Sequence, residues 1–345
     1  EEMNRSRPAS WVARAVERGF LSSLPRASSP SRLAAACLLV ALAGVLAPAV
    51  SLGAVDPLSG LYRLQQTDLS VRFQSIRFEV VRQFDSTLPA AGLDQDGWTF
   101  RPMDKRILPP QDEDSLYLQN GAELAEFVRS GQQGDYTSPR NERIARRPDG
   151  FVLVLGDGTE ETYDNEGMLT AVDTPGGPAM HLKYLQGRLA AISAAGRDLL
   201  MLKYNPGGLV ERIEAYNGDA AVYRYDGQGL LASVTDQNNL TTRFQYHGPG
   251  RISRVDFQTG DFVQLDYDKD SGRVQTATTR DGSVQYAYRE DKQGEVCSVA
   301  VTSPSGTEKY EIRGGGSIVE LTDALGNRTT SLYASGRLVR YSDAR

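Results

Sequence analysis

Cysteine and histidine are scarce, because the chain of 345 residues contains only two of each. A disulfide framework and a cysteine-rich metal site both need several cysteines at characteristic spacings. A Ser-His-Asp pattern and a glycine-rich phosphate loop are also missing. His181 and His247 occupy unrelated positions, and His247 directly follows Tyr246, where we expect a turn residue. Cys297 falls in an expected strand, where packing is its ordinary role. The sequence therefore predicts no catalytic residue and no cofactor.

Basic clusters are missing as well. The chain has 38 Lys and Arg residues against 44 Asp and Glu residues, which gives a net charge of −6. A nucleic-acid-binding surface needs a basic stripe or patch, so we exclude nucleic acid as the main partner. No amphipathic helix of usual length stands out in residues 159–345. Regular strand signals and 34 glycines instead favour an all-β protein.

Only one long apolar run is present, and it covers residues 33–55 without a single charge. Arginines precede this run, and Ala47-Pro48-Ala49 and Leu52-Gly53-Ala54 are candidate cleavage sites. This arrangement is typical of a secretion signal, although the run is long enough to cross a bilayer. We predict that residues 1–54 are a signal peptide or an N-terminal membrane segment. The remainder would then be secreted or extracellular, or held at the cell envelope, with membrane contact only through residues 33–55.

The dominant feature is a repeat of about 21 residues between Tyr163 and the end of the chain. Each copy has an aromatic anchor, a polar turn, a glycine and two apolar residues three positions apart. The anchors are Tyr163, Tyr184, Tyr204, Tyr225, Tyr246, Tyr267, Tyr288, Tyr310 and Tyr333. A unit this short cannot bury its own core and must stack on its neighbours. We therefore expect function to reside in the array as a whole.

A glycine follows every anchor within a few residues. These glycines are Gly167, Gly187, Gly208, Gly229, Gly250, Gly272, Gly294, Gly316 and Gly336. Asn, Asp, Pro and Gly in the same segments are turn formers, so each copy predicts a β-hairpin. Before the anchor, the sequence alternates between apolar and polar residues, as in Thr242-Arg243-Phe244-Gln245-Tyr246, which indicates a strand buried on one face.

The strand after each glycine departs from simple alternation. Its two apolar residues, such as Leu231 and Val234, are three positions apart, and this spacing places them on opposite faces of a flat strand. Two explanations remain open. A β-bulge could restore a one-sided strand, or both faces of the strand could be partly covered.

Residues 55–158 differ from the array and form a separate β-rich region. Residues 67–84 alternate well enough for two strands, and residues 116–118 and 151–155 read as further strands. This region would cap the first repeat, because an open strand edge invites aggregation. Residues 159–345 hold nine repeats, and the last copy is interrupted at the chain end. We read the array as truncated at its C-terminus.

The repeat resembles the tyrosine-aspartate (YD) repeat of Rhs proteins and teneurins. The best matches are Tyr163-Asp164 with Gly167, and Tyr225-Asp226 with Gly229. The upstream Arg82-Gln-Phe-Asp-Ser86 and Gly97-Trp98 are similar to the lead-in of bacterial Rhs proteins. The resemblance spans residues 56–345. Asp follows the anchor only at Tyr163, Tyr225 and Tyr267, so most copies depart from the strict motif.

The resemblance implies a β-sheet strip that spirals into a hollow shell, of which this chain would form an N-terminal part. It also implies a non-catalytic scaffold that encloses or presents a C-terminal toxin or effector. Partners would be the remaining C-terminal repeats and that cargo, and any toxin activity would lie beyond Arg345. The alternative is a cell-surface adhesion or carbohydrate-binding module, with a glycan or protein partner, as the teneurin relatives suggest.

One turn resembles a calcium loop. Asp266, Asp268 and Asp270 alternate and could supply hard oxygen ligands. Ser271 and Ala277, however, stand where the EF-hand pattern needs a glycine and an acid. The competing interpretation is a repeat turn lengthened by one residue.

The row of tyrosines also has two interpretations. Exposed rings could stack on sugar rings, or the rings could pack along the strip and cover one another. A single aromatic face favours packing. The sequons at Asn239 and Asn327 matter only in a host that glycosylates them.

Overall fold

The structure is a computed structural model that describes residues 52–86, 97–101, 103–108, 114–121, 123–130, 135–138, 142–334 and 337–344. The described chain divides into two compact units. The central unit comprises Arg63–Phe262, and the terminal unit comprises the segment up to Tyr62 together with Val263–Arg345. The predicted signal segment lies outside the described residues except for its last three positions, and so does Gly336.

The first strands form a four-stranded sheet in the order β1-β2-β3-β4. Their bounds are β1 (Ala54–Val55), β2 (Tyr62–Phe73), β3 (Ile76–Asp85) and β4 (Trp98–Arg101). The second and third strands are the pair predicted from residues 67–84. They are joined by a tight turn at Gln74, which has a φ of 52°.

A second sheet starts in the predicted lead-in region. Its first strands are β5 (Lys105–Leu108), β6 (Ser115–Asn120), β7 (Glu123–Ser130), β8 (Asp135–Thr137), β9 (Arg143–Arg147) and β10 (Gly150–Val154). Strand β9 pairs with β10, and β10 pairs with the first repeat strand, β11 (Glu160–Tyr163). The lead-in region therefore extends the repeat sheet at its N-terminal end.

The repeats continue this sheet through the central unit as antiparallel hairpins. The strands are β12 (Leu169–Asp173), β13 (Met180–Leu185), β14 (Arg188–Ala194), β15 (Arg197–Tyr204), β16 (Val210–Ala215), β17 (Ala220–Tyr225), β18 (Leu231–Thr235), β19 (Thr241–Gly248) and β20 (Arg251–Phe257).

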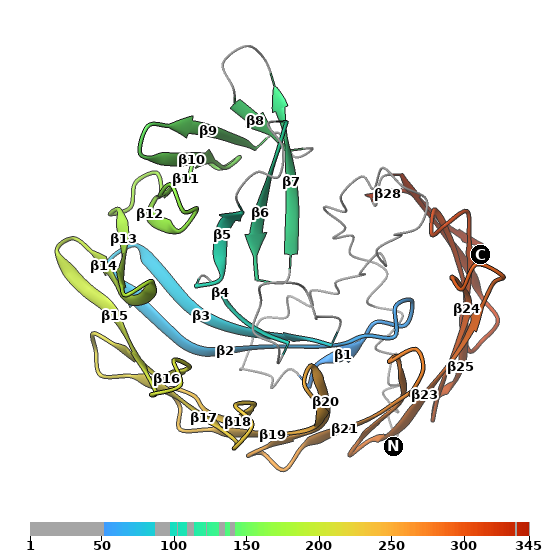
Figure 1. Ribbon diagram of the computed structural model, residues 1–345. Coiled ribbons are helices and arrows are strands. Elements are labelled where there is room, and N and C mark those ends of the chain that lie inside the picture. Colours follow the sequence, from blue (N-terminus) through green and yellow to red (C-terminus); the bar gives the residue numbers. More distant parts are fainter. Residues whose placement is uncertain are drawn as a thin grey trace, which may run out of the picture. The chain divides into compact units, whose positions relative to one another are not determined.

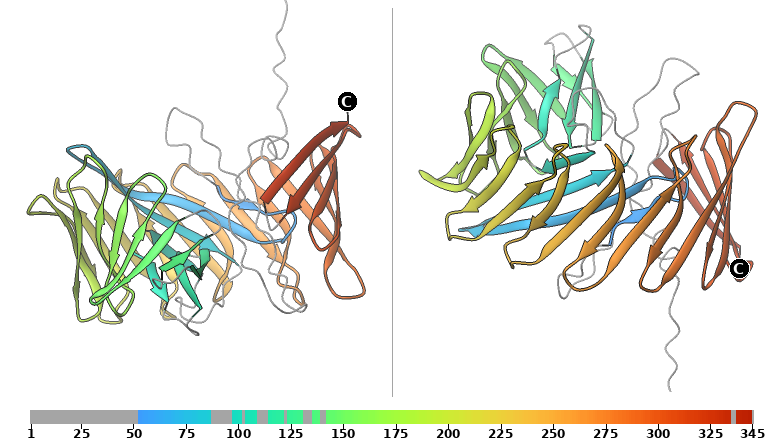
Figure 2. Two further views of the ribbon diagram at one scale, coloured as in Figure 1. Left: turned by 90° about the horizontal axis from the view of Figure 1, so that it is seen from above. Right: turned by 60° about the horizontal axis from the view of Figure 1, so that its bottom comes forward.

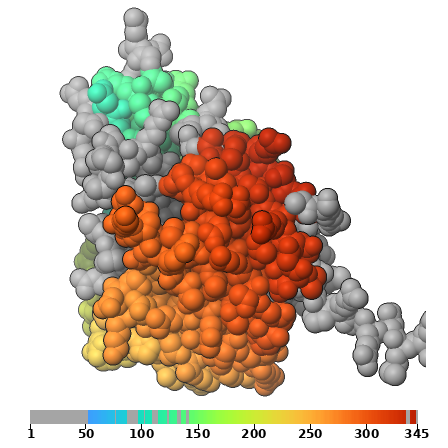
Figure 3. Space-filling view, turned by 90° about the vertical axis from the view of Figure 1, so that its right-hand side faces the viewer, coloured from blue at the N-terminus to red at the C-terminus, as the bar shows by residue number. Residues whose placement is uncertain are grey.

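The terminal unit carries the last strands. They are β21 (Phe262–Tyr267), β22 (Val274–Thr279), β23 (Gly282–Glu290), β24 (Val296–Ser303), β25 (Gly306–Arg313), β26 (Ile318–Thr322), β27 (Arg328–Ala334) and β28 (Arg337–Ala344). Figure 3 shows the face of this unit on which the orange to red residues reach the surface. Together, β5 to β28 form a sheet of 24 strands that is not closed. The predicted all-β fold of tandem hairpins is confirmed.

Bulges resolve the question of the three-residue apolar spacing. Tyr163 pairs with Leu169 and Thr162 pairs with Ala171, so Thr170 is skipped. The same shift recurs at Tyr184, Tyr204, Tyr225, Tyr246, Tyr267 and Tyr333. Because the bulge skips one residue, the second apolar residue lies on the same face of the strand as the first. In β18, for example, Leu231 and Val234 are both buried. The pairing of β25 with β26 has no such shift.

Within the central unit, β2–β4 lie inside the curve of the repeat hairpins (Figures 1 and 2). Two turns of the array form hydrogen bonds with the backbone of β2. Gln237 donates its backbone amide to the Asp68 carbonyl and accepts the Ser70 amide on its side chain, at 3.1 and 2.7 Å. Tyr216 donates its hydroxyl to the Arg72 carbonyl at 2.9 Å. These bonds satisfy backbone groups that a free strand edge would leave open.

The lead-in strands also turn back on the first repeat. The Ile107 amide of β5 donates to the Gly167 carbonyl at 2.9 Å, and Arg106 forms a β-bridge with Met168. Gly167 has a φ of 80°, and a Cβ at this position would lie 1.9 Å from the Ile107 oxygen. Only glycine can occupy this turn without displacing β5.

Candidate functional site

Four repeat tyrosines form what we call the tyrosine ladder. Each donates its hydroxyl to a backbone carbonyl of the preceding repeat, 15 residues earlier. The bonds are Tyr184 to Leu169 at 2.9 Å, Tyr204 to Leu189 at 2.8 Å, Tyr225 to Val210 at 2.9 Å and Tyr246 to Leu231 at 2.8 Å. The acceptor is always the residue that pairs with the tyrosine of the preceding repeat.

That acceptor is also the residue at which the bulge begins. Leu169, for example, pairs with Tyr163 just before the skipped Thr170. A bulge interrupts the ladder of backbone hydrogen bonds, and a buried carbonyl needs a partner from elsewhere. The next tyrosine supplies that partner. Bulge and tyrosine therefore depend on each other, and both recur with the period of the repeat.

Other anchors use their hydroxyls differently. Tyr163 donates to Glu161 at 2.6 Å and Tyr310 donates to Glu308 at 3.3 Å. Glu161 also accepts Lys105 Nζ at 2.5 Å. Burial, together with the charge of Glu161, raises the pKa of Tyr163 above its ordinary value. The Tyr288 hydroxyl is buried and has no hydrogen-bond partner within the described part of the chain.

The remaining anchors, Tyr267 on β21 and Tyr333 on β27, are half-buried. Burial raises the pKa of Tyr333. None of the nine anchors is among the most exposed large apolar side chains of the described residues. The arrangement favours the packing interpretation of the tyrosine row.

The aspartate of the YD motif closes the turn. Asp226 Oδ1 accepts the amides of Gln228 and Leu230 at 2.8 and 2.9 Å. The same two-bond arrangement occurs at Asp236, Asp291 and Asp323. Sequence reasoning looked for this residue only beside the tyrosine and missed these three. The spacing Asp-x-x-Gly, or Asp-x-x-Asn at Asp236, is the signal that could have found them.

The repeat glycines lie in the turns that follow the anchors. Gly167, Gly187, Gly208, Gly229, Gly250, Gly272, Gly294 and Gly316 all have positive φ. Asn239 takes this position after Asp236, with a φ of 61°, which places its sequon on an exposed turn. The other sequon residue, Asn327, is exposed and donates its side-chain amide to Asp323 at 2.8 Å.

The candidate calcium residues do not converge. Asp268 Oδ1 accepts the Asp270 and Ser271 amides, at 3.2 and 2.7 Å, and so closes its own turn. The Ser271 amide lowers the pKa of Asp268. Asp266 and Asp270 are exposed. The described residues contain no group of three acidic, histidine or cysteine side chains placed to hold a metal ion.

His181 and His247 lie on β13 and β19 and are both exposed. The expectation that His247 is a turn residue is wrong. Gly248 still pairs with Arg251, so the hairpin continues beyond Tyr246 and His247 is a skipped strand residue. Cys297 is half-buried on β24, where its thiol donates to the Arg289 carbonyl at 3.3 Å.

A buried charged cluster attaches β2–β4 to the repeat sheet. Arg82 donates two hydrogen bonds to Asp68, at 3.0 and 3.1 Å, and both side chains are almost completely buried. The guanidinium carbon of Arg82 lies 4.5 Å from the centroid of the Trp98 ring and 5.0 Å from that of the Phe244 ring. Tyr223 of the array donates to Asp68 at 3.1 Å.

Burial raises the pKa of Asp68, and the charge of Arg82 opposes that rise. The cluster was not predicted as a site. Its signal was Arg82, a charged residue at a strand position whose neighbours of the same parity, Val80 and Phe84, are apolar.

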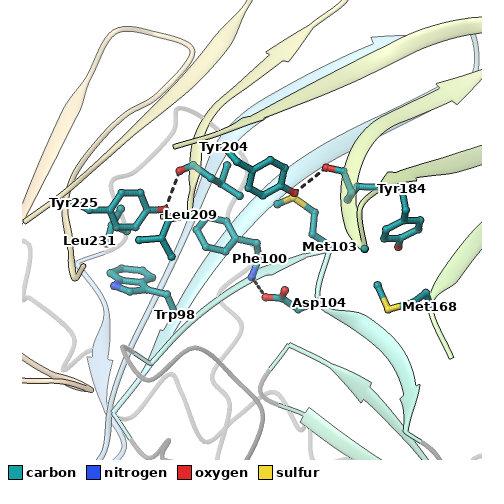
Figure 4. Close-up of a pocket in the computed structure, with 14 residues that line it drawn as sticks. Trp98, Phe100, Met103, Asp104, Met168, Tyr184, Tyr204, Leu209, Tyr225 and Leu231 are labelled. Carbon is teal, nitrogen blue, oxygen red and sulfur yellow. Dashed lines mark hydrogen bonds between the residues drawn. The ribbon is translucent and has the colours of Figure 1, made fainter. Parts of the chain in front are cut away.

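A pocket of about 210 Å3 lies beside this cluster in the central unit (Figure 4). Three ladder tyrosines line it, namely Tyr184, Tyr204 and Tyr225. Trp98 and Phe100 of β4 face them, and Asp104 Oδ2 accepts the Phe100 amide at 2.5 Å. Five of its 14 lining residues are aromatic, and we call it the aromatic pocket.

The repeated hairpins, the bulges and the tyrosine ladder define a YD-repeat shell fold. The family described as Teneurin YD-shell matches residues 155–312. The predicted resemblance is confirmed. No curated protein sequence matches the chain.

Several solved structures are similar at low identity. The crystal structure of TcdB2-TccC3-TEV has a TM-score of 0.41 and 13% identity, over 88% of this chain and 20% of the other. The crystal structure of TcdB2-TccC3-Cdc42 has a TM-score of 0.39 and 13% identity, over 80% and 19%. A Tc holotoxin pore from Photorhabdus luminescens has a TM-score of 0.37 and 12% identity, over 80% and 19%. The chain thus spans about a fifth of the length of these chains.

None of the described residues forms a helix long and apolar enough to span a membrane. The predicted membrane or signal segment falls outside the part of the chain that was searched.

Proposed function

We propose that this chain is a non-catalytic scaffold of a secreted or cell-envelope protein, and that it forms part of the wall of a YD-repeat shell. The tyrosine ladder is the observation that carries the proposal. The residues that recur with the repeat act on the fold itself: tyrosines bond to the previous hairpin, aspartates close turns and glycines adopt positive φ. Because the recurring residues of the repeat all have structural roles, the repeat suits the wall of a shell better than a row of active sites.

The shell would enclose or present a toxin or effector encoded after Arg345. The family match and the one-sided burial of the hairpins support this part of the proposal, because a sheet with a continuous inner face can surround a lumen. The N-terminal 54 residues would direct export and would be cleaved or remain as an anchor.

A protease-protection experiment tests the proposal. The protein is produced with the natural sequence that follows Arg345, treated with proteinase under native conditions, and compared with the downstream segment produced alone. Protection of the downstream segment only when the repeats are present is expected. Equal digestion in both samples, or a stop codon soon after Arg345, would rule out the proposal that the shell carries a toxin or effector.

An adhesion or carbohydrate-binding module is the second candidate, and the aromatic pocket is the observation in its favour. Glycan-array binding that is lost when Tyr204 is replaced by leucine would support this role. A silent array would count against it.

A further inference from the structure

The aromatic pocket of the central unit has an unusual electrostatic lining. Five aromatic rings contribute to it, from Tyr184, Tyr204, Tyr225, Trp98 and Phe100. Met103 and Met168 add two thioethers, and Asp104 adds a carboxylate. Among the described residues that line the pocket there is no lysine, arginine or histidine. The wall therefore offers several aromatic faces, and Asp104 is the only acidic side chain among the described residues that line it.

The hydrogen-bond donors of this wall are already used. The Tyr184, Tyr204 and Tyr225 hydroxyls donate to backbone carbonyls, and the Trp98 indole N–H donates to Tyr246 at 2.8 Å. A tyrosine oxygen that donates its proton still keeps acceptor lone pairs. The pocket can therefore accept hydrogen bonds and offer ring faces, but it has few donors for an anion or a carbonyl.

Aromatic faces attract cations, most strongly where water is excluded. One ring of the pocket already shows this preference. The guanidinium carbon of Arg188, an exposed residue whose guanidinium also lies against the lining residue Gly208, is 5.7 Å from the Tyr204 ring centroid. Burial raises the pKa of Tyr204, the charge of Arg188 opposes that rise, and the charge of Asp104 adds a smaller upward contribution.

We propose that this pocket binds a small organic cation of the quaternary-ammonium or protonated-amine class. The volume of about 210 Å3 accommodates a compact cation with its alkyl groups against the rings. Phe100, Trp98 and the ladder tyrosines would supply the cage, and Asp104 would supply the nearest full negative charge. A neutral molecule of the same shape would gain the apolar contact but not the cation–π attraction.

The test uses a cation and its uncharged isostere. Choline and 3,3-dimethyl-1-butanol are titrated into the protein, and binding is measured by calorimetry and by saturation transfer to ligand protons. Choline should bind about tenfold more tightly, in line with a cation–π contribution of 1 to 2 kcal/mol. Equal affinity for the two compounds, or no binding of choline, would overturn the proposal.

Substitutions test whether choline binds in this pocket. Asp104→Asn keeps an oxygen for the Phe100 amide but removes the charge, and should weaken choline several-fold while leaving the alcohol unchanged. Tyr184→Leu should remove most choline binding, whereas Tyr184→Phe should retain it because the ring remains. Arg188→Gln should tighten choline binding by removing a competing cation.

Asp256→Asn is the matched control, because Asp256 pairs with Arg254 at 2.8 Å and does not line the pocket. Thermal unfolding of each variant reports whether the fold is kept. Loss of choline binding in Asp256→Asn to the same extent as in Asp104→Asn would contradict the assignment, and so would unchanged binding in Asp104→Asn.

Discussion

The repeat tyrosine contributes two separate things to the central unit, a ring that packs on the inner face and a hydroxyl that bonds to the previous hairpin. The bond matters because its acceptor lies at a bulge, where the strand ladder gives that carbonyl no regular partner. Removing the hydroxyl alone leaves the ring in place and isolates the contribution of the bond.

Tyr225→Phe and Tyr246→Phe should differ in their effect on the free energy of unfolding. Tyr225→Phe removes the donor to the Val210 carbonyl and should cost about 1 to 3 kcal/mol. Tyr246→Phe should cost more, because the Leu231 carbonyl and the Trp98 indole both lose a partner. Chemical denaturation measures both values. Tyr341→Phe, at an exposed position, is the control, and an equal effect in all three variants would contradict the role of the ladder.

The tyrosines also predict a response to alkali. Burial raises the pKa of Tyr184 from 10.0 to about 12, and burial also raises the pKa of Tyr204 and Tyr223. A folded-state pKa above the unfolded value means that this stability is present below pH 10.0 and is lost as the pH rises towards 12. Tyrosinate absorbance should therefore show an early step from exposed tyrosines and a later step that coincides with loss of β-structure. A single step at the ordinary pKa would disagree with buried rings.

Among the elements, the turn between β11 and β12 is a close junction of the lead-in with the array. Gly167→Ala combines a left-handed backbone with a Cβ that would lie 1.9 Å from the Ile107 oxygen. Gly229→Ala is a matched control, with a φ of 83° and only an ordinary contact with the Leu209 side chain at 4.0 Å. The control should cost about 1 to 2 kcal/mol for the unfavourable φ, and Gly167→Ala should cost clearly more. Thermal unfolding distinguishes them, and equal costs would show that β5 is not held by this turn.

The β2–β4 sheet is held by a buried ion pair rather than by apolar contacts alone. Arg82→Met leaves Asp68 charged and buried and should destabilise the protein by about 3 to 5 kcal/mol. Arg254→Met removes a partly exposed pair on β20 and should cost at most about 1 kcal/mol. Adding Asp68→Leu to Arg82→Met should recover part of the loss. Failure to recover would mean that the pair is not the source of the cost.

The array was predictable from the sequence, and the attachment of β2–β4 was not. Tyr, Gly and the apolar pairs recur locally, so their hairpins follow from neighbouring residues. The spacing of Leu231 and Val234 indicated a bulge as one of two explanations, and the register shows that bulge. By contrast, Arg82, Trp98 and Tyr223 meet only because strands far apart in the sequence pack together. No local pattern encodes that contact, and the pocket of Figure 4 depends on it.

At the scale of the whole molecule, the central claim is that hairpins joined by tyrosines build a wall that continues into a shell around a lumen. The direct measurement is a cryo-electron microscopy map of the protein produced together with the sequence that follows Arg345. We predict that further hairpins extend the sheet from β28 and that density for the downstream segment lies inside the enclosed space. A map in which the downstream segment is folded outside the sheet, with the inner face open to solvent, would contradict the account.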